Sequence, residues 1–236
     1  ESPMLDMRLF RRGAFTGALL VNLLSVVALV GFLYFVTQHL QLIVGLSPLQ
    51  AGLALVPGLA LMIVSGLAVV PVSRRVSPRV VVPVALALSV AAYVVIAVST
   101  DAAALGILIG AFALLGIGIG AAETVSNELI LATAPPAKAG AASAVSETAY
   151  ELGAVLGTAV LGGILTALYR AGLVLPDGVP AGAAAAARET LGGAVTVADG
   201  LPDALGDRVV EAAASAFDAG VGVTSIIGAV LVVCAA

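Results

Sequence analysis

Two glutamates four residues apart, Glu147 and Glu151, lie in an otherwise apolar and small-residue stretch, and they are the side chains best placed for chemistry. In a helix this spacing puts both carboxylates on one face. At a rise of about 1.5 Å per residue, they lie about 9 Å and about 15 Å along the helix from Ala141. If a membrane core begins near Ala141, Glu151 lies close to the bilayer midplane. An ionisable group at a membrane-helix centre costs about 2.5–3.5 kcal/mol on insertion scales.

A carboxylate pair at that depth can take up and release a proton, and it can bind a cationic substrate in competition with the proton. We therefore predict that Glu147 and Glu151 couple a proton to a substrate cation. The alternative is a structural pair, hydrogen-bonded to Ser, Thr or Tyr side chains of neighbouring helices. Tyr150 is a further candidate cavity residue on the same segment.

The composition excludes several classes of protein. Of 236 residues, 61% are hydrophobic and 10% are charged, and the mean hydropathy is +1.18. A soluble domain carries about 45–50% apolar and about 25% charged residues. So little charge cannot cover a globular surface, which argues against a soluble enzyme, a nucleic-acid-binding protein and a disordered segment. We expect an all-α, polytopic membrane bundle, with the lipid bilayer and not nucleic acid as its partner.

Catalytic and metal sites are not predicted. His39 and Cys234 are the single histidine and cysteine, so the chain can form no internal disulfide and no Cys/His zinc site. The glycines at 116–120 superficially resemble a dinucleotide-binding loop, but they lie inside a predicted helix without a preceding strand. We expect no enzyme activity, no metal and no cofactor, with a proton as coupling ion.

Six apolar stretches are long enough, or nearly so, to cross a core about 30 Å thick as helices. They cover residues 14–37, 49–72, 80–98, 102–132, 141–168 and 217–236. We divide the chain into an entry segment (1–13), five transmembrane helices (14–168), a long external loop (169–216) and a last, truncated span (217–236). Leu205, Val209, Ala212 and Ala216 recur at helical spacing, which predicts a short amphipathic loop helix that leads into the last span.

The basic residues set the orientation. With a cytoplasmic N-terminus, the inside loops hold seven of the ten basic residues. They are Arg8, Arg11, Arg12, Arg74, Arg75, Arg79 and Lys138. The positive-inside rule favours this orientation, with both chain ends in the cytoplasm.

Weaker candidates lie in the second and fourth spans. Glu123 and Glu128 fall at the cytoplasmic end of the fourth span, where we expect cavity or interfacial positions, and Asn127 is placed to hydrogen-bond Glu123. Pro57 interrupts the second span and could line a cavity through a kink. Small-xxx-small pairs predict close helix packing. They are Gly106 with Gly110, Gly116 with Gly120, and Gly153 with Gly157.

The two ends suggest a piece of a longer chain. The sequence begins at Glu1 with no signal peptide pattern, and it ends inside an apolar run.

The segment APPAKAGAASAVSETAYELG (134–153) resembles the fourteen-span drug:proton antiporters of the major facilitator superfamily. Three shorter segments agree in family order. They are LFRR (9–12), LSPLQAGLALVP (46–57) and SRRVSPR (73–79). The resemblance implies spans nine to fourteen, the C-terminal half of a multidrug exporter. The missing N-terminal half would be its partner, and cationic or amphipathic drugs its substrates.

The resemblance also implies roles for single residues. Glu147 and Glu151 match acids of the thirteenth span that take part in proton coupling and recognition of cationic drugs. Ser146 stands where some relatives carry another acid, and Met62 lies where some dication exporters carry one. The implied location is a bacterial inner membrane. The alternative function is a facilitator or exporter of one specific metabolite or antibiotic, with structural glutamates.

Overall fold

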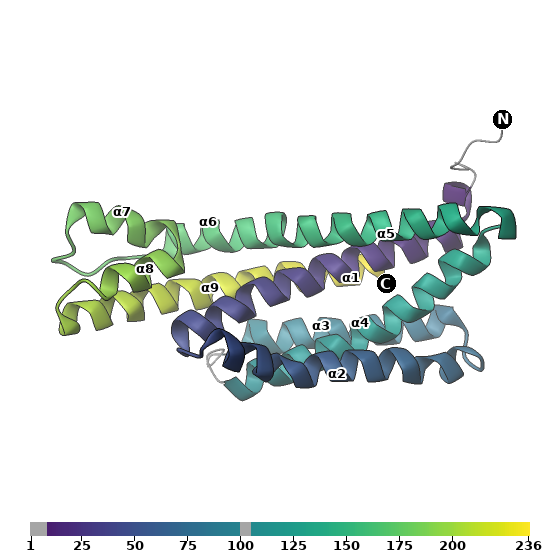
Figure 1. The fold of residues 1–236 in the computed structure, drawn as a ribbon, viewed down its shortest axis with the longest axis horizontal. Helices are drawn as coiled ribbons and strands as arrows, with labels where there is room; N and C mark the ends of the chain where they lie inside the picture. The colour runs from purple at the N-terminus through teal and green to yellow at the C-terminus, as the bar shows by residue number, and fades with distance from the viewer. Residues whose placement is uncertain (1–8, 100–104) are drawn as a thin grey trace.

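The computed structural model describes residues 9–99 and 105–236, and within them every regular element is helical (Figure 1). Six helices are long and apolar enough to cross a membrane, as the sequence predicted. They are α1 (Gly13–Gln38), α2 (Pro48–Ser73), α3 (Pro78–Val98), α4 (Leu105–Thr133), the α5–α6 helix and α9 (Asp203–Ala235). The start predicted for the fourth span, near Ala102, lies outside the described residues.

Two spans contain π-helical segments. The α5–α6 helix consists of α5 (Ala139–Leu156), a π-helical segment (Gly157–Gly162) and α6 (Gly163–Gly172), and a 3-10 turn (Pro136–Lys138) precedes it. It is longer at both ends than the predicted 141–168. The end of α1 continues as a second π-helical segment, His39–Ile43.

The residues predicted to form a short amphipathic helix before the last span are helical, and they belong to the same helix as that span. Residues 203 to 235 form one continuous helix, α9, because no Gly–Pro break separates the amphipathic part from the apolar part. Hydropathy located the apolar part near Phe217 but not the start of the helix, which follows Pro202. The loop before α9 contains two further short helices, α7 (Ala181–Glu189) and α8 (Leu191–Ala198).

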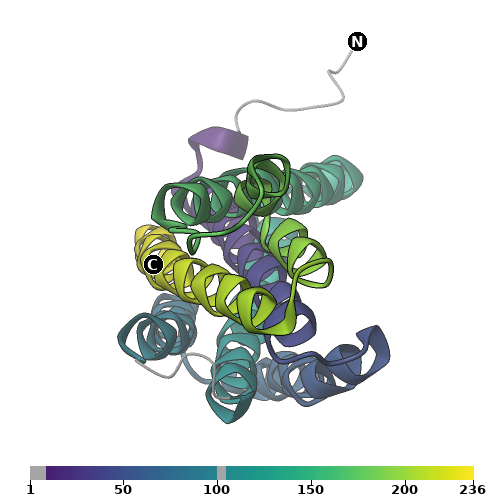
Figure 2. The same ribbon diagram turned by 90° about the vertical axis from the view of Figure 1, so that its left-hand side faces the viewer.

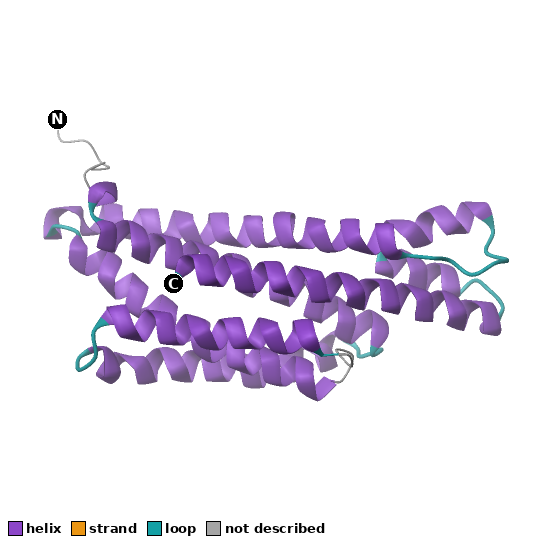
Figure 3. Ribbon diagram, turned by 180° about the vertical axis from the view of Figure 1, so that it is seen from behind, coloured by secondary structure: helices purple, strands orange, loops and turns teal. Residues whose placement is uncertain are grey.

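The helices form an elongated bundle with its turns at the two ends (Figure 3). The α5–α6 helix runs along one side, α2 and α3 run along the opposite side, and α1, α4 and α9 lie between them (Figures 1 and 2). Helix α4 packs against α1, α2 and α3, whereas α1 also contacts α5 and α9. Helices α7 and α8 lie beside the first part of α9, at one end of the bundle.

Local sequence signals explain where α2 begins. Gly45 has a φ of 78°, which glycine adopts without the strain of a Cβ atom. Ser47 and Gln50 then form a capping box, with Pro48 at the first helical position. The Ser47 hydroxyl accepts a hydrogen bond from the Gln50 N–H, and the Gln50 side chain accepts one from the Ser47 N–H.

Aromatic rings fill the centre where α1, α3 and α4 meet. Phe32 stacks on Phe112 with ring centroids 5.7 Å apart and meets Tyr93 edge-on at 5.9 Å. All three side chains are buried, and the Tyr93 hydroxyl donates a hydrogen bond to the Ala28 carbonyl. The polar tip of Tyr93 is thereby satisfied inside an apolar core.

Glycines bring α4 against α2 and α5 against α1. A Cβ added at Gly116 would lie 2.7 Å from the Gly58 carbonyl oxygen, and one added at Gly120 would collide with the Met62 carbonyl. Added Cβ atoms at Gly153 and Gly157 would lie 2.9 Å and 2.8 Å from carbonyl oxygens of α1. Gly106 and Gly110 differ from expectation, because they are exposed and nothing lies within 4 Å of an added Cβ.

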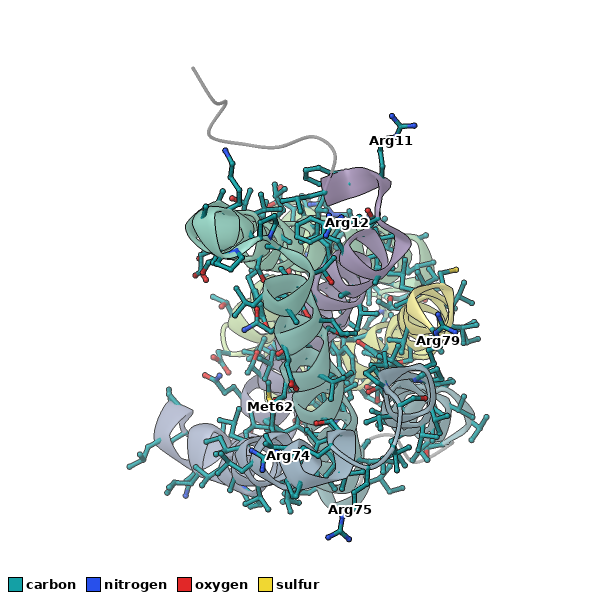
Figure 4. The ribbon with its side chains drawn as sticks, turned by 90° about the vertical axis from the view of Figure 1, so that its right-hand side faces the viewer. Arg11, Arg12, Met62, Arg74, Arg75 and Arg79 are labelled. Carbon is teal, nitrogen blue, oxygen red and sulfur yellow. The ribbon has the colours of Figure 1, made fainter. Side chains whose placement is uncertain are left out.

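The arginines Arg11, Arg12, Arg74, Arg75 and Arg79 lie at one end of the bundle, which we call the arginine end (Figure 4). Arg12 donates a hydrogen bond of 2.6 Å to the Thr133 carbonyl, so it ties the start of α1 to the last turn of α4. These five arginines, which were predicted to lie in loops on the same side of the membrane, therefore lie at the same end of the bundle. That this end is cytoplasmic stays a prediction.

The glycine packing is testable with two alanine variants. Gly120→Ala should lower the free energy of unfolding by about 1–3 kcal/mol, because the new methyl meets backbone that cannot move without separating α2 from α4. Thermal unfolding in detergent measures the effect. Gly110→Ala is the matched control on the same helix, and it should leave stability unchanged or raise it by up to about 1 kcal/mol. Equal effects of the two variants would contradict the packing argument.

Candidate functional site

Glu147 and Glu151 both lie on the exposed side of α5. They follow Ala139 by eight and twelve residues, about 12 Å and about 18 Å along the helix. Neither carboxylate forms an ion pair within residues 9–99 and 105–236. The structure therefore places both carboxylates deep along a predicted span and open to whatever covers this face.

A hydrogen-bonded chain of two amides and a hydroxyl lies beside them and joins three helices. The Asn22 side chain of α1 donates to the Ser146 hydroxyl of α5 at 3.3 Å, and this hydroxyl donates to the Asn127 side-chain oxygen of α4 at 3.2 Å. Asn22 and Ser146 are both buried. The sequence predicted a hydrogen bond between Asn127 and Glu123, but in the structure the hydrogen-bond partner of Asn127 is Ser146.

Glu123 is buried inside the bundle, and the interfacial depth expected from the sequence stays a prediction. Its side chain is 8% exposed, and it precedes the end of α4 at Thr133 by ten residues, about 15 Å. Glu128 is exposed near the end of the helix, closer to the expected position.

Tyr150 lies between the buried and the exposed carboxyl groups. Its hydroxyl is hydrogen-bonded to the Glu123 side chain, and its charge environment includes Glu147. The other carboxyl oxygen of Glu123 is buried without a partner, as are the hydroxyls of Ser25 and Ser126. A carboxyl, a phenol and a second carboxyl in this order can hold a proton and exchange it between the interior and the exposed face.

The cavities of this chain lie elsewhere. An apolar groove of about 1000 Å³ runs between α1 and α5 and includes Leu20, Leu23 and Leu152, but neither Glu147 nor Glu151 lines it. Pro57 lies on the exposed side of α2, and its neighbour Gly58 packs against Phe112 of α4. Met62 of α2 packs against Gly116 and Gly120, so the position that is acidic in some exporters is part of a helix contact here.

Comparison with known proteins decides the family. Residues 2–176 match the family model described as Major Facilitator Superfamily. The chain belongs to this superfamily. A crystal structure of a bacterial homologue of the human lysosomal transporter Spinster, inward-facing and unoccupied, agrees in fold. It matches with a TM-score of 0.68 at 18% identity, over 100% of this chain and 51% of the other.

The relatives with the highest reported identities are named as efflux, resistance and export proteins. The multidrug efflux pump LfrA of Mycolicibacterium smegmatis is 45% identical over 235 residues, which are 100% of this chain and 47% of the pump. The methyl viologen resistance protein SmvA of Salmonella typhimurium is 35% identical over 219 residues, 91% of this chain and 43% of that protein. The chain thus spans about half the length of the curated relatives that it matches.

One polar contact of this major facilitator chain was missed from the sequence. His39 had been treated as an isolated residue, but its ring Nδ1 lies 3.1 Å from an Asp218 carboxylate oxygen. The two residues are 179 positions apart, so no local pattern pointed to the contact. An acid near the start of the last apolar run was the one signal that could have suggested it.

The Glu123–Tyr150 contact predicts a measurable coupling. Tyr150→Phe should destabilise the protein by about 1–3 kcal/mol, because it leaves a buried carboxyl without its hydrogen-bond partner. In a double-mutant cycle with Glu123→Gln, the coupling should be about 0.5–3 kcal/mol by thermal or chemical unfolding in detergent. Tyr34→Phe, at a half-buried tyrosine of α1, is the control and should show no coupling to Glu123→Gln. Additive effects of Tyr150→Phe and Glu123→Gln would contradict the contact.

Proposed function

We propose that this chain is the C-terminal half, spans nine to fourteen, of a proton-coupled multidrug efflux antiporter of a bacterial inner membrane. Its substrates are cationic or amphipathic compounds. The names of the similar proteins, which include a multidrug efflux pump and a resistance and export protein, support the export of drugs. The share of about half of each relative supports the assignment to a half-transporter.

The observation that carries the coupling proposal is the polar cluster on α4 and α5. Glu147 and Glu151 lie one turn apart on an exposed face, and Tyr150 connects this face to the buried Glu123. Carboxylates that face hydrocarbon are costly, so this face borders a water-filled cavity or the other half of the transporter. There the negative charge attracts a cationic drug.

Competition between the proton and the drug then drives export. With the cavity open to the inside, the ionised carboxylates bind the drug cation. With the cavity open to the outside, protons enter at Glu151 and Glu147, cancel the charge and release the drug. The energy comes from the proton gradient, because one charge that crosses about 100 mV yields about 2.3 kcal/mol.

The N-terminal half is the predicted partner of this chain. The substrate cavity of such transporters lies between two repeats, so one repeat alone lacks half of the cavity wall. We expect the isolated chain to show no ethidium efflux, and co-production with an N-terminal half should restore it. Efflux by the isolated chain at the full-length rate would contradict the half-transporter assignment.

The carboxylates are tested by ethidium efflux from energised vesicles that contain the full-length transporter. Glu151→Gln and Glu147→Gln each keep the side-chain shape but remove the charge, and each should lower proton-driven efflux at least about tenfold, the effect of about 1.4 kcal/mol. Glu211→Gln, at an exposed acid of α9, is the control and should retain efflux. Immunoblots of the membranes correct for differences in protein amount.

The alternative function gives a different result in the same vesicles. In a facilitator or exporter of one specific metabolite or antibiotic, with structural glutamates, transport persists unchanged after the proton gradient is collapsed. Drug resistance that survives both Glu→Gln substitutions would likewise remove the proposed coupling mechanism.

A further inference from the structure

His39 and Asp218 form a partly buried pair just after the end of α1, away from the arginine end of the bundle. The imidazole Nδ1 lies 3.1 Å from the carboxylate, and the side chains are 2% and 29% exposed, respectively. The pair joins α9 to the π-helical segment that continues α1.

The second ring nitrogen of His39, Nε2, is a proton acceptor without a hydrogen-bond partner, and it is buried. A neutral imidazole has one N–H donor and one bare acceptor nitrogen. Because Nδ1 faces a carboxylate oxygen, the proton belongs on Nδ1, and Nε2 carries the lone pair. This tautomer is inferred from the hydrogen-bond geometry.

A proton that binds at Nε2 finds its countercharge already in place. The imidazolium carries one positive charge and Asp218 one negative charge, so the protonated pair is electrically neutral. The deprotonated pair leaves one negative charge among apolar helices. Protonation also turns the contact into a charge-assisted hydrogen bond between two ions, which is stronger than the contact of a neutral ring.

The elements around the pair carry few charged groups. Helix α6, which packs against α9, carries Arg170 in its last turn, and Arg170 lines a cavity together with Tyr34 of α1. Helices α2 and α8 contain no Asp, Glu, Lys or Arg, and neither does α1. The charged residues of α3 and α4, which are Arg79, Glu123 and Glu128, lie toward the arginine end. On α9 the nearest is Glu211, seven residues before Asp218 and about 10 Å along the helix.

The tyrosines away from the arginine end are largely occupied by other contacts. The Tyr93 hydroxyl donates to Ala28, and the Tyr169 hydroxyl donates to the Ala187 carbonyl. Tyr34 lies five residues before His39 on α1 and is half-buried. Asp218 is the charged group in direct contact with the His39 ring.

A cavity between α3 and α9 gives water and protons access to the Asp218 carboxylate of the pair. This cavity has a volume of about 410 Å³, and Asp218 lines it together with Ser99 and Ile96. Ser99 follows the last residue of α3, so the cavity lies at the end of that helix. The proton source is thus the solution on the side opposite the arginines.

We propose that His39 and Asp218 are a proton-binding site away from the arginine end of the bundle. The proton comes from solvent water, binds at His39 Nε2 and is held as an imidazolium–carboxylate pair, while Asp218 remains ionised. The site lies on elements other than those of Glu147 and Glu151. Proton binding here does not depend on the transport function, so its test can fail or succeed independently of the efflux assays.

The test is a nuclear magnetic resonance titration of the protein, labelled with ¹⁵N and ¹³C in its histidines and reconstituted in lipid nanodiscs. The His39 signal is assigned by its loss in His39→Gln. We expect the ring nitrogen shifts to change from imidazole to imidazolium values between about pH 8 and about pH 5, the range in which histidine changes charge. In Asp218→Asn the imidazolium should be lost from this range. Asp203→Asn, at the start of α9, is the matched control and should titrate like the wild type.

Two results would overturn the site. One is a titration in Asp218→Asn that coincides with that of the wild type, and the other is the absence of any imidazolium in the wild type down to about pH 5. Should Asp218→Asn fail to fold, Asp218→Glu keeps the carboxylate and should retain the transition. A folded Asp218→Glu without the transition would equally contradict the proposal.

Discussion

An ionisable group in the apolar part of a membrane helix must be neutralised, paired or given an aqueous boundary, and this constraint governs the placement of charge in this chain. Helices α1 and α2 meet it by carrying no Asp, Glu, Lys or Arg. Glu123 meets it through Tyr150, and Asp218 through His39. Glu147 and Glu151 remain exposed on α5, so the partner or aqueous boundary that they require has to come from outside this chain.

The fold was largely predictable because hydropathy reports the membrane part of a helix directly. All six spans were found from their apolar length, and Ser47-Pro48 marked the start of α2. Helix ends outside the membrane were not predictable in the same way, because backbone hydrogen bonding continues wherever no residue interrupts it. Helix α9 therefore begins at Asp203, well before its apolar run, and the α5–α6 helix extends to Gly172.

The candidate site was only partly predictable, because sequence spacing reports neighbours along one helix and not contacts between helices. The single-face arrangement of Glu147 and Glu151 follows from a spacing of four residues. The Asn22–Ser146–Asn127 chain and the burial of Glu123 depend on how α1, α4 and α5 pack. The small-xxx-small pattern had the same limit. It matched Gly116 and Gly120, which pack against α2. It equally matched Gly106 and Gly110, where an added Cβ would meet no atom of the described residues within 4 Å.

The outer faces of α2 and α5 differ in a way that bears on how the chain is completed. The exposed side of α2 carries large apolar residues such as Leu53, Ile63 and Leu67, which can face lipid or an apolar helix equally well. The exposed side of α5 adds Glu147 and Glu151 to its apolar residues, and hydrocarbon cannot cover these carboxylates cheaply. A boundary of water, cationic substrate or polar protein surface is therefore required on the α5 side. Under the proposed function, a second transporter half that encloses an aqueous cavity would provide that boundary, and the same cavity would give the two glutamates access to both protons and drug.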